Sequence, residues 1–170
     1  MNNIRFVGID PSLKSTGIVI LDEEGKVVEQ FAIAAGKEED PLRFMKVANR
    51  IRKHLDPSTD KVIIEAFSFG SKGAGVSKMY GIGWTIRIML EQNGFKWGEV
   101  APTALKKFAT GKGQAKKEDL VLPVYKKWGF ESTVNDITDA FVLSRIGYHM
   151  YNHEGLLEYE KEVLKKLKKV

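Results

Sequence analysis

The stretch that decides the fold is residues 4–21, which read IRFVGIDPSLKSTGIVIL. Residues 4–9 are mostly apolar, as in a buried strand, and after turn-forming residues a β-branched run follows at 18–20. The pattern predicts a hairpin whose first strand ends on Asp10. An ionised carboxylate beside a packed strand is costly unless a cation or hydrogen bonds meet it, so Asp10 is a candidate metal or active-site residue. The alternative is that Asp10 only caps its own turn.

Composition bounds the class of protein. The chain has 170 residues, and 43% of its side chains are apolar. This is enough for one well-filled hydrophobic core but short for two, so we expect a single domain. It contains no cysteine, which excludes disulfides, thiolate metal sites and a cysteine nucleophile, and agrees with a reducing cytoplasm. The sequence shows neither a signal-peptide pattern nor an apolar run of membrane-spanning length, so we expect a cytoplasmic protein with no membrane contact. The net charge of +5 modestly favours a polyanionic partner.

A second strand that ends on an acid follows further along the chain. Residues 27–35 predict a third strand of an antiparallel meander, and the apolar spacing of residues 41–55 predicts a helix. Residues 61–65 are a short apolar run, typical of a fully buried strand, and finish on Glu65. If the helix makes the usual right-handed crossover, this strand lies parallel to the first. Glu65 and Asp10 would then be neighbours at one edge of the sheet.

A glycine-rich loop with two aromatic residues comes next. Residues 67–75 carry Phe67, Phe69 and Lys72, and a glycine-rich loop of this kind can be mobile and expose an aromatic side chain. The alternative is that one of the two rings anchors the loop as part of the core. Residues 76–93 predict a helix whose small residues Gly81 and Gly83 allow close approach of another backbone, as core or as a subunit interface.

The following segment is strongly basic. We expect a strand at residues 97–101 and a short helix at 102–109. Residues 106–117 contain no acid and five lysines: Lys106, Lys107, Lys112, Lys116 and Lys117. The segment lacks the order of a phosphate-binding P-loop, so we do not predict nucleotide hydrolysis. The clustered positive charge favours a polyanionic partner. Residues 118–128 predict a helix in which Pro123 makes a kink or lies in the first turn.

Two further acids share one helix face near the C-terminal end. Residues 134–143 predict a helix with Thr133 or Asn135 as N-cap, and the i,i+3 spacing makes Asp136 and Asp139 point the same way. The alternative is that both acids only complement the helix dipole in its first turn. Residues 154–170 predict a charged amphipathic helix, which we expect to be solvated or loosely docked, the alternative being contact with nucleic acid.

Acids at the ends of three separate buried elements point to a metal site. Oxygen-only ligands suit Mg²⁺, with Mn²⁺ able to replace it, and Asp10, Glu65, Asp136 and Asp139 are the candidate ligands. Two ions held by such carboxylates can activate water and stabilise a leaving oxygen. The constellation therefore predicts phosphodiester hydrolysis with two ions in each site.

The chain resembles the RuvC-type Holliday junction resolvases of the RNase H-like superfamily. The resemblance rests on four motifs in the family's order: GIDPSLKSTG at 8–17, VIIEAFSFG at 62–70, APTALKKFATGKGQAKK at 101–117 and NDITDAFVLS at 135–144. It implies an α/β fold with a five-stranded mixed sheet flanked by helices, a homodimer, and four-way junctions or other branched DNA as the substrate. Ser12 departs from the glycine usual in cellular members, and the added Lys107, Lys112 and Lys116 make the basic loop more basic than in those members. We expect a phage-encoded or otherwise mobile member.

The resemblance also implies roles for individual residues. Asp10, Glu65, Asp136 and Asp139 match the family's catalytic acids, and Lys106 and Lys117 match lysines associated with DNA binding and cleavage. Phe67 or Phe69 lies where the family carries an aromatic residue that probes the opened junction. We expect residues 1–152 to form the nuclease domain and residues 153–170 a charged helical tail. The alternatives are an RNase H-like nuclease of broader branched-DNA or RNA specificity, and a non-catalytic binder of branched DNA.

Overall fold

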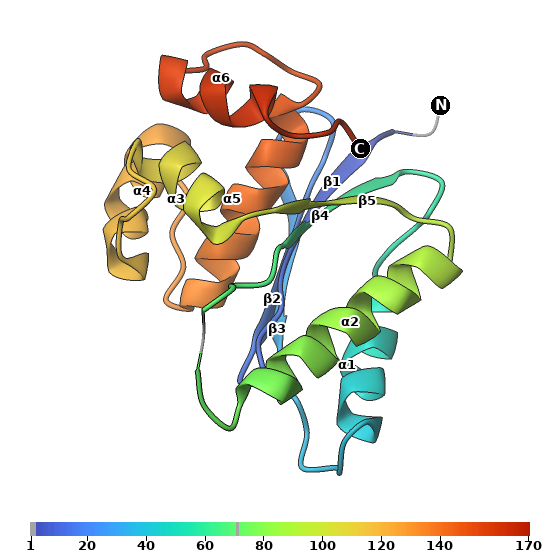
Figure 1. The fold of residues 1–170 in the computed structure, drawn as a ribbon. Helices are drawn as coiled ribbons and strands as arrows, with labels where there is room; N and C mark the ends of the chain where they lie inside the picture. The colour runs from blue at the N-terminus through green and yellow to red at the C-terminus, as the bar shows by residue number, and fades with distance from the viewer. Residues whose placement is uncertain (1–2, 71) are drawn as a thin grey trace.

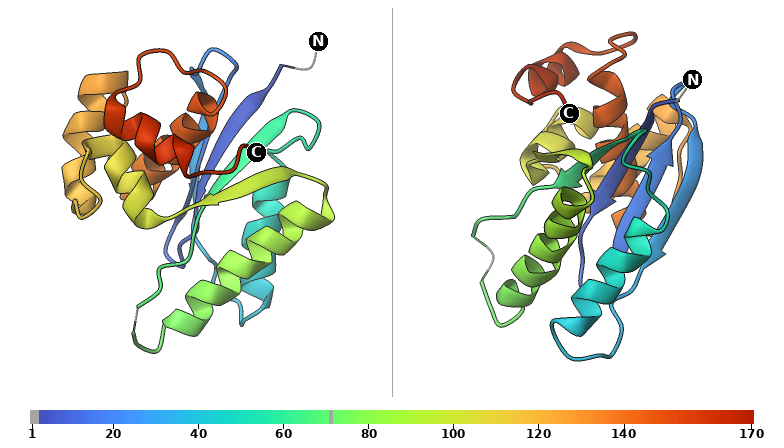
Figure 2. Two further views of the ribbon diagram at one scale, coloured as in Figure 1. Left: turned by 45° about the horizontal axis from the view of Figure 1, so that its top comes forward. Right: turned by 90° about the vertical axis from the view of Figure 1, so that its right-hand side faces the viewer.

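The computed structural model describes residues 3–70 and 72–170 and shows one sheet between two layers of helices (Figures 1 and 2). In chain order the elements are β1 (Arg5–Asp10), β2 (Thr16–Leu21), β3 (Val27–Ile33), α1 (Leu42–Arg52), β4 (Asp60–Glu65), α2 (Val76–Gln92), β5 (Lys96–Val100), α3 (Pro102–Thr110), the 3₁₀ turn η1 (Lys117–Leu120), α4 (Val121–Trp128), α5 (Asn135–His149) and α6 (Glu158–Lys165). No helix within these described residues is long and apolar enough to cross a membrane.

The sheet has five strands in the order β3-β2-β1-β4-β5. The first three strands form the expected antiparallel meander, and β4 runs parallel to both β1 and β5. Ile9 pairs with Ile64, so Asp10 and Glu65, each the next residue along, leave adjacent strands at the same edge. This register confirms the expectation that the two acids are neighbours.

Each face of the sheet is covered by its own helices because side chains alternate along the strands. Val7, Ile9 and Ile64 pack under α1 and α2, whereas Phe6 and Ile63 pack with the helices on the opposite face. Figure 1 shows α1 and α2 on one side and α3 to α6 on the other. All of these strand side chains are at most 2% exposed, which explains why β1 and β4 read as nearly continuous apolar runs.

Helix α5 lies unusually close to β1 and β2, and glycines make this possible. A Cβ atom on Gly8 would lie 1.9 Å from the carbonyl oxygen of Ala140, and one on Gly17 would lie 2.1 Å from that of Asp136. No side chain fits in either place. The two glycines therefore bring the first turns of α5 onto the ends of β1 and β2, next to Asp10.

Two expectations for the helical segments need correction. The N-cap residue of α5 is Val134 and makes no side-chain cap, so neither Thr133 nor Asn135 has that role; Asn135 is already helical. The Oγ atom of Ser132 instead accepts a hydrogen bond from the Val134 backbone. The single helix expected at 118–128 is divided into η1 and α4, and Pro123 lies in the first turn of α4, where a missing N–H is tolerated.

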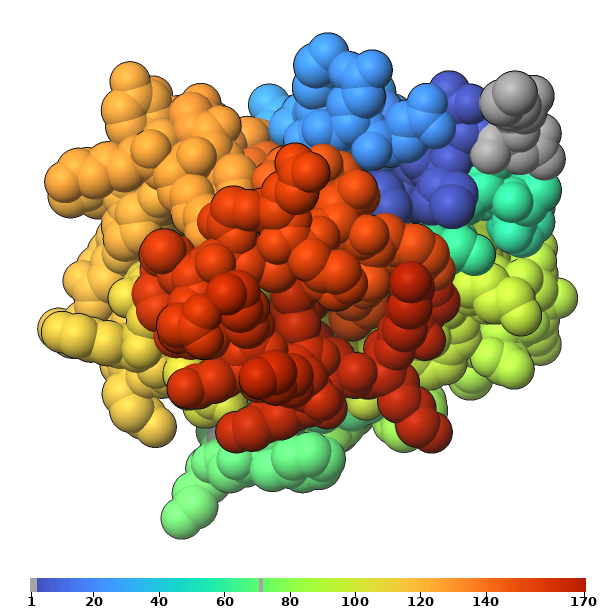
Figure 3. Space-filling model, turned by 90° about the horizontal axis from the view of Figure 1, so that it is seen from above, coloured from blue at the N-terminus to red at the C-terminus, as the bar shows by residue number. Residues whose placement is uncertain are grey.

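The C-terminal segment is docked, not solvated. The helix within it is only α6, and its Val163 is 4% exposed in the same core as the sheet. Glu160 is fully buried and forms an ion pair with Lys127 of α4, and Glu162 pairs with Lys107 of α3 at 2.6 Å. Figure 3 shows the segment lying across the upper face of the molecule. The expectation of a solvated or loosely docked tail is therefore wrong for α6.

Candidate active site

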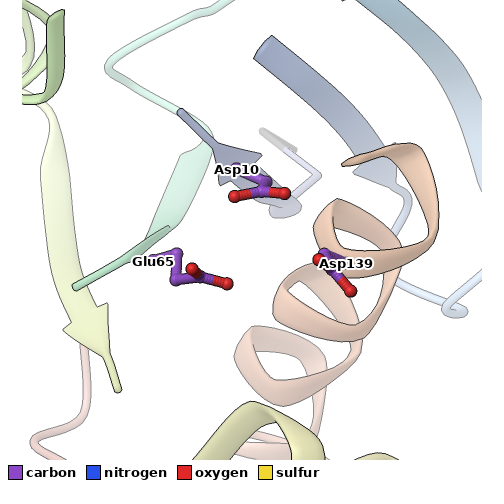
Figure 4. Close-up of side chains that lie close together, drawn as sticks. All are labelled: Asp10, Glu65 and Asp139. Atoms are coloured by element: carbon purple, nitrogen blue, oxygen red, sulfur yellow. The ribbon is translucent and has the colours of Figure 1, made fainter. Parts of the chain in front are cut away.

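Three carboxylates from different elements converge at the edge of the sheet. Asp10 ends β1, Glu65 ends β4, and Asp139 projects from the second turn of α5. One oxygen from each lies within 4.8 Å of the other two, and Figure 4 shows the three carboxylates facing a common space. Asp10 and Asp139 are only 3% and 4% exposed. The structure therefore brings together three of the four acids that the sequence singled out.

The fourth acid, Asp136, lies at the rim and is joined to the others through Lys117. The Nζ atom of Lys117 is 2.8 Å from Asp139, 3.6 Å from Asp136 and 3.7 Å from Asp10. The side chain of Asp136 is 21% exposed, against 5% for that of Asp139. The i,i+3 spacing correctly predicted that both acids face the same way, but Asp139 is the deeper of the two.

The acids are held close together in a poorly solvated place, which changes their proton affinity. Burial, and then the charge of Glu65, raise the pKa of Asp10 well above its ordinary value. Burial and the charge of Asp139 raise the pKa of Glu65 to about 7. Burial on its own would lower the pKa of Lys117, but the surrounding carboxylates outweigh it and raise that pKa. The single positive charge of Lys117 therefore does not neutralise the four carboxylates around it.

The residues present fit a divalent cation. The Oδ2 atom of Asp10 is buried and has no hydrogen-bond partner among the described residues, although buried carboxylate oxygens normally have one. All of the converging ligand atoms are carboxylate oxygens, which is the donor set that Mg²⁺ and Mn²⁺ prefer. A bound cation would complete the coordination of Asp10 and offset the repulsion among the acids.

The turn after Asp10 is stabilised by other residues. The Oγ atom of Ser12 accepts hydrogen bonds from the backbones of Lys14 and Ser15, and the Thr16 hydroxyl donates to the carbonyl of Ser12. The side-chain hydrogen bonds of the turn thus come from Ser12 and Thr16. The capping role considered for Asp10 finds no support in these contacts.

The predicted DNA-binding lysines occupy different positions. Lys117 reaches the acids, and Lys106 of α3 is near enough to Glu65 for its charge to lower the pKa of that carboxyl. Lys112 and Lys116 are exposed, whereas Lys107 is turned toward the C-terminal segment by its ion pair with Glu162. Lys117 and Lys106 are therefore the lysines closest to the acid cluster.

The two loop phenylalanines also have different surroundings. Phe69 is 86% exposed, and Lys72 is exposed as well. The ring of Phe67 instead packs on Tyr80 and Trp84 of α2, with centroid distances of 4.9 and 5.4 Å. Phe67 thus anchors the loop, and Phe69 is the aromatic side chain left free to reach a ligand.

One buried residue beside the site went unnoticed in the sequence. Arg87 of α2 donates a hydrogen bond to the backbone carbonyl of Glu65 at 2.9 Å and is 1% exposed. A signal was available, because Arg87 follows Gly83 by four residues and so lies on the same, apolar side of the helix.

Comparison with known proteins now identifies the family. The model of the family "Crossover junction endodeoxyribonuclease RuvC" matches residues 6–145, which is most of the chain. This chain belongs to the RuvC family. The RuvC of Ruegeria pomeroyi is 29% identical over 122 residues, covering 69% of this chain and 74% of that protein. The RuvC of Campylobacter jejuni is 27% identical over 151 residues, covering 84% and 92%.

Solved structures of RuvC share the fold. Thermus thermophilus RuvC superposes with a TM-score of 0.71 at 18% identity, covering 86% of this chain and 95% of that one. The same enzyme in complex with a Holliday junction substrate gives a TM-score of 0.67 at 16% identity, covering 86% and 94%. The RNase H-like fold and the membership of the RuvC family, both expected from the sequence motifs, are confirmed.

Proposed function

We propose that this RuvC family member is a structure-selective endonuclease that resolves four-way DNA junctions by paired, symmetric nicks. The observation that carries the proposal is the convergence of Asp10, Glu65 and Asp139 within 4.8 Å beside Lys117. The curated relatives are crossover junction endodeoxyribonucleases, and one solved relative holds a Holliday junction substrate. A protein that only bound branched DNA would not need buried acids that repel one another.

The proposed metal ligands are Asp10, Glu65, Asp136 and Asp139, holding two Mg²⁺ ions for which Mn²⁺ substitutes. When bound, such ions supply an activated water and stabilise the leaving oxygen of the phosphodiester. Asp10 and Asp139 lie deepest and hold their carboxylates in fixed positions. Asp136 at the rim, with 21% of its side chain exposed, is accessible to incoming DNA.

Lys117 has a second role in this proposal. Its ammonium group lies among the carboxylates and is 47% exposed, so it also faces the solvent side from which DNA arrives. An ammonium group so placed donates hydrogen bonds to the scissile phosphate and stabilises the negative charge that develops there.

The DNA surface combines lysines with one aromatic residue. Phosphates are contacted by four lysines: Lys72, Lys106, Lys112 and Lys116. Lys107 can contact a phosphate as well once its ion pair with Glu162 breaks. Phe69 stacks on a base at the junction centre, an interaction worth about 1–3 kcal/mol. A two-fold symmetric junction needs two equivalent sites, so the working unit is a C₂ homodimer, acting on DNA in the cytoplasm.

The deciding experiment is incubation of the protein with a synthetic four-way junction and Mg²⁺, followed by mapping of the cuts on each strand. The expected products are symmetric nicks on two strands of like polarity, which a ligase reseals. Flaps and RNA–DNA hybrids are tested in parallel. Equal cutting of those substrates would indicate a nuclease of broader specificity, and tight binding without cutting would indicate an architectural protein.

A further inference from the structure

Arg87 is the largest side chain that the described part of the structure buries completely. Its guanidinium group lies inside the molecule, on the face of α2 that packs toward the sheet. Removal of a permanently charged group from water is costly unless hydrogen bonds and opposite charge compensate it. The partners of Arg87 therefore show what its burial accomplishes.

Each side of the guanidinium group has a partner. Nε donates to the Glu99 carboxylate of β5 at 2.5 Å, and Nη1 donates to the carbonyl of Gly83 at 3.0 Å. Nη2 donates to the backbone carbonyl of Glu65 at 2.9 Å. The ring of Phe67 lies 4.1 Å from the guanidinium carbon, within the range of a cation–π contact. Arg87 thus joins α2, the end of β4, the end of β5 and the start of the loop.

The contact with Glu65 comes at the point where the chain leaves the sheet. Glu65 is the last residue of β4, and Ala66 makes one further bond to β5 through its backbone N–H. Arg87 contacts this segment on both sides of Ala66, through the carbonyl of Glu65 and the ring of Phe67, and the same ring also packs on Tyr80 and Trp84 of α2. The side chain of the same Glu65 belongs to the acid cluster. Movement of the carbonyl would therefore move the carboxylate.

We propose that Arg87 is a positioning residue: it fixes the backbone of Glu65, so that the carboxylate of Glu65 stays within reach of Asp10 and Asp139. This inference rests on the proposed metal-dependent cleavage. In it, Arg87 supports the reaction without contacting either the metal or the DNA. All three hydrogen-bonding nitrogens of Arg87 are occupied within the chain, so the side chain acts only through its neighbours. By anchoring Phe67 it also fixes the base of the loop that carries Phe69.

Only arginine supplies this geometry. Its planar fork directs donors from three separate nitrogens at fixed angles, whereas lysine carries all of its donors on one nitrogen and cannot span the three acceptors around the guanidinium group. Arg87→Lys therefore keeps the positive charge and most of the buried volume but loses the simultaneous contacts. Glu99→Gln removes the charge of this partner but keeps a side-chain oxygen that accepts the hydrogen bond from Nε, and it leaves the contact with Glu65 in place.

The test measures metal affinity as well as activity. For wild type and Arg87→Lys, the melting temperature is followed as Mg²⁺ is added, junction affinity is measured in EDTA, and cleavage is measured at saturating junction. We expect Arg87→Lys to need about tenfold more Mg²⁺ for half of the thermal stabilisation and to cut about tenfold more slowly or worse, which is the usual effect of losing a residue that orients a metal ligand. Junction affinity in EDTA should stay within about twofold.

Two control variants separate positioning from general stability. Arg145→Lys alters a partly buried arginine, which stacks on Tyr148 at 4.6 Å and donates to the carbonyl of Gly25, away from the acids. It should lower the melting temperature without changing the Mg²⁺ midpoint. Glu99→Gln should leave both the midpoint and the cleavage rate close to wild type.

Three results would overturn the proposal. The first is a folded Arg87→Lys variant with the wild-type Mg²⁺ midpoint and cleavage rate. The second is a shift of the midpoint in Arg145→Lys as large as that in Arg87→Lys. If Arg87→Lys does not fold, Arg87→Gln is measured in its place, and failure of both to fold would make Arg87 a purely structural residue. A wild-type protein that is stabilised by Mg²⁺ but cuts no junction would reject the proposed function alone, since the Mg²⁺ midpoint still tests Arg87.

Discussion

Replacement of Asp10 by asparagine removes one charge from the centre of the acid cluster and changes the shape of the side chain little. We expect Asp10→Asn to abolish junction cleavage, because an amide is a poor ligand for Mg²⁺, and to retain junction binding, because the basic surface is untouched. Cleavage and binding are measured in the same Mg²⁺ buffer. Glu23→Gln, which changes an exposed carboxyl in the β2–β3 turn, is the matched control. Near-normal cleavage by Asp10→Asn would remove Asp10 from the site.

The raised pKa of Glu65 predicts how stability depends on pH when no metal is bound. A carboxyl whose pKa rises to about 7 on folding binds its proton more tightly in the folded than in the unfolded protein. Its contribution to stability is complete at acidic pH and is lost as pH rises through about 7. Most of this loss falls between the ordinary pKa of 4.5 and about 7, so the melting temperature in EDTA should still be falling at pH 6.5 and should level off above about pH 7.5, where Mg²⁺ should raise it again.

A matched variant isolates this effect from that of His149. Burial lowers the pKa of His149 to about 4, so this group gives stability the opposite slope below its ordinary pKa of 6.5. Glu65→Gln leaves His149 unchanged. The difference in melting temperature between Glu65→Gln and wild type should therefore widen with rising pH, in favour of the variant. A difference that is constant with pH would contradict the assignment.

Replacement of Lys117 by alanine should change two measurable properties, the cleavage rate and the melting temperature. Loss of its ammonium group should slow cleavage more than it weakens binding, because the charge lies 2.8 Å from Asp139, beside the position proposed for the scissile phosphate. Lys117→Ala should also lower the melting temperature in EDTA and increase the gain on adding Mg²⁺, because the acids then lack their only close cation among the described residues. Lys112→Ala, an exposed lysine of the same segment, should change neither melting temperature.

The positions of some site residues could be predicted from the sequence, and those of others could not. Asp10 and Glu65 could be predicted as neighbours because each ends a buried strand, and parallel strands end at one edge. The different depths of Asp136 and Asp139 could not be predicted from the sequence. The periodicity of a helix shows which face its residues share, but it does not show how far the helix lies from the sheet. That distance depends on the close approach of α5 at Gly8 and Gly17, a contact between segments more than a hundred residues apart.

At the scale of elements, the loop between β4 and α2 carries the clearest test. Phe69 is 86% exposed, so Phe69→Ala should not change the melting temperature. It should slow cleavage of a fully paired junction about tenfold, which corresponds to about 1.4 kcal/mol, while sparing a junction with unpaired bases at its centre. Phe67→Ala should instead lower the melting temperature, because its ring packs on Tyr80 and Arg87. Equal slowing of Phe69→Ala on both junctions would rule out base unstacking by this residue.

The basic segment from α3 to η1 should contact phosphates through its exposed lysines. Each phosphate contact contributes about −0.9 to the slope of log affinity against log salt concentration. Replacement of Lys112 and Lys116 by alanine should therefore reduce the magnitude of that slope by up to about 2, measured by fluorescence anisotropy of a labelled junction. Lys107→Ala should have a smaller effect, because that lysine first has to give up its ion pair with Glu162. An unchanged slope would assign Lys112 and Lys116 to the solvated surface.

Elements with strong periodicity were predicted well, and the docked C-terminal segment was not. The strands are apolar or β-branched runs bounded by turn residues, α2 has helical spacing of its apolar residues, and the predicted bounds agree with the structure within about two residues. In α6 the charged residues outnumber the apolar ones, which is typical of a solvated helix. The pattern could not show that Glu160 finds a buried partner in Lys127, because the two residues come from segments that meet only in the folded molecule.

At the scale of the whole molecule, the topology could be derived once the order of strands and helices was known. A meander followed by right-handed crossovers leaves few arrangements of five strands, and β3-β2-β1-β4-β5 is one of them. The sequence did not determine how α2 is oriented. Gly83 was expected to allow close approach of another backbone, but a Cβ atom there would lie 2.4 Å from the ring of Phe67. Gly83 therefore faces the interior of its own subunit, and substitution there would disturb folding.

The side of α2 that faces solvent is the better candidate for the dimer interface. Trp84 and Ile88 lie one turn apart and are 54% and 52% exposed, and Met45 of α1 is 49% exposed. Large exposed apolar side chains on adjacent helices mark association surfaces. Because Trp84 also contacts Phe67, Ile88 is the residue whose replacement disturbs the subunit least.

Ile88→Glu should therefore give a folded monomer, since a charge at the centre of an apolar two-fold interface meets its own copy. Light scattering and the melting temperature report assembly and folding. On a supercoiled plasmid with an extruded cruciform, a dimer cuts both strands in one encounter and yields linear DNA, whereas the monomer should yield mainly nicked circles. Leu122→Glu alters a residue of α4 that is 58% exposed and should keep the dimer and the linear product. A dimeric Ile88→Glu variant that still linearises the plasmid would move the interface away from this side of α2.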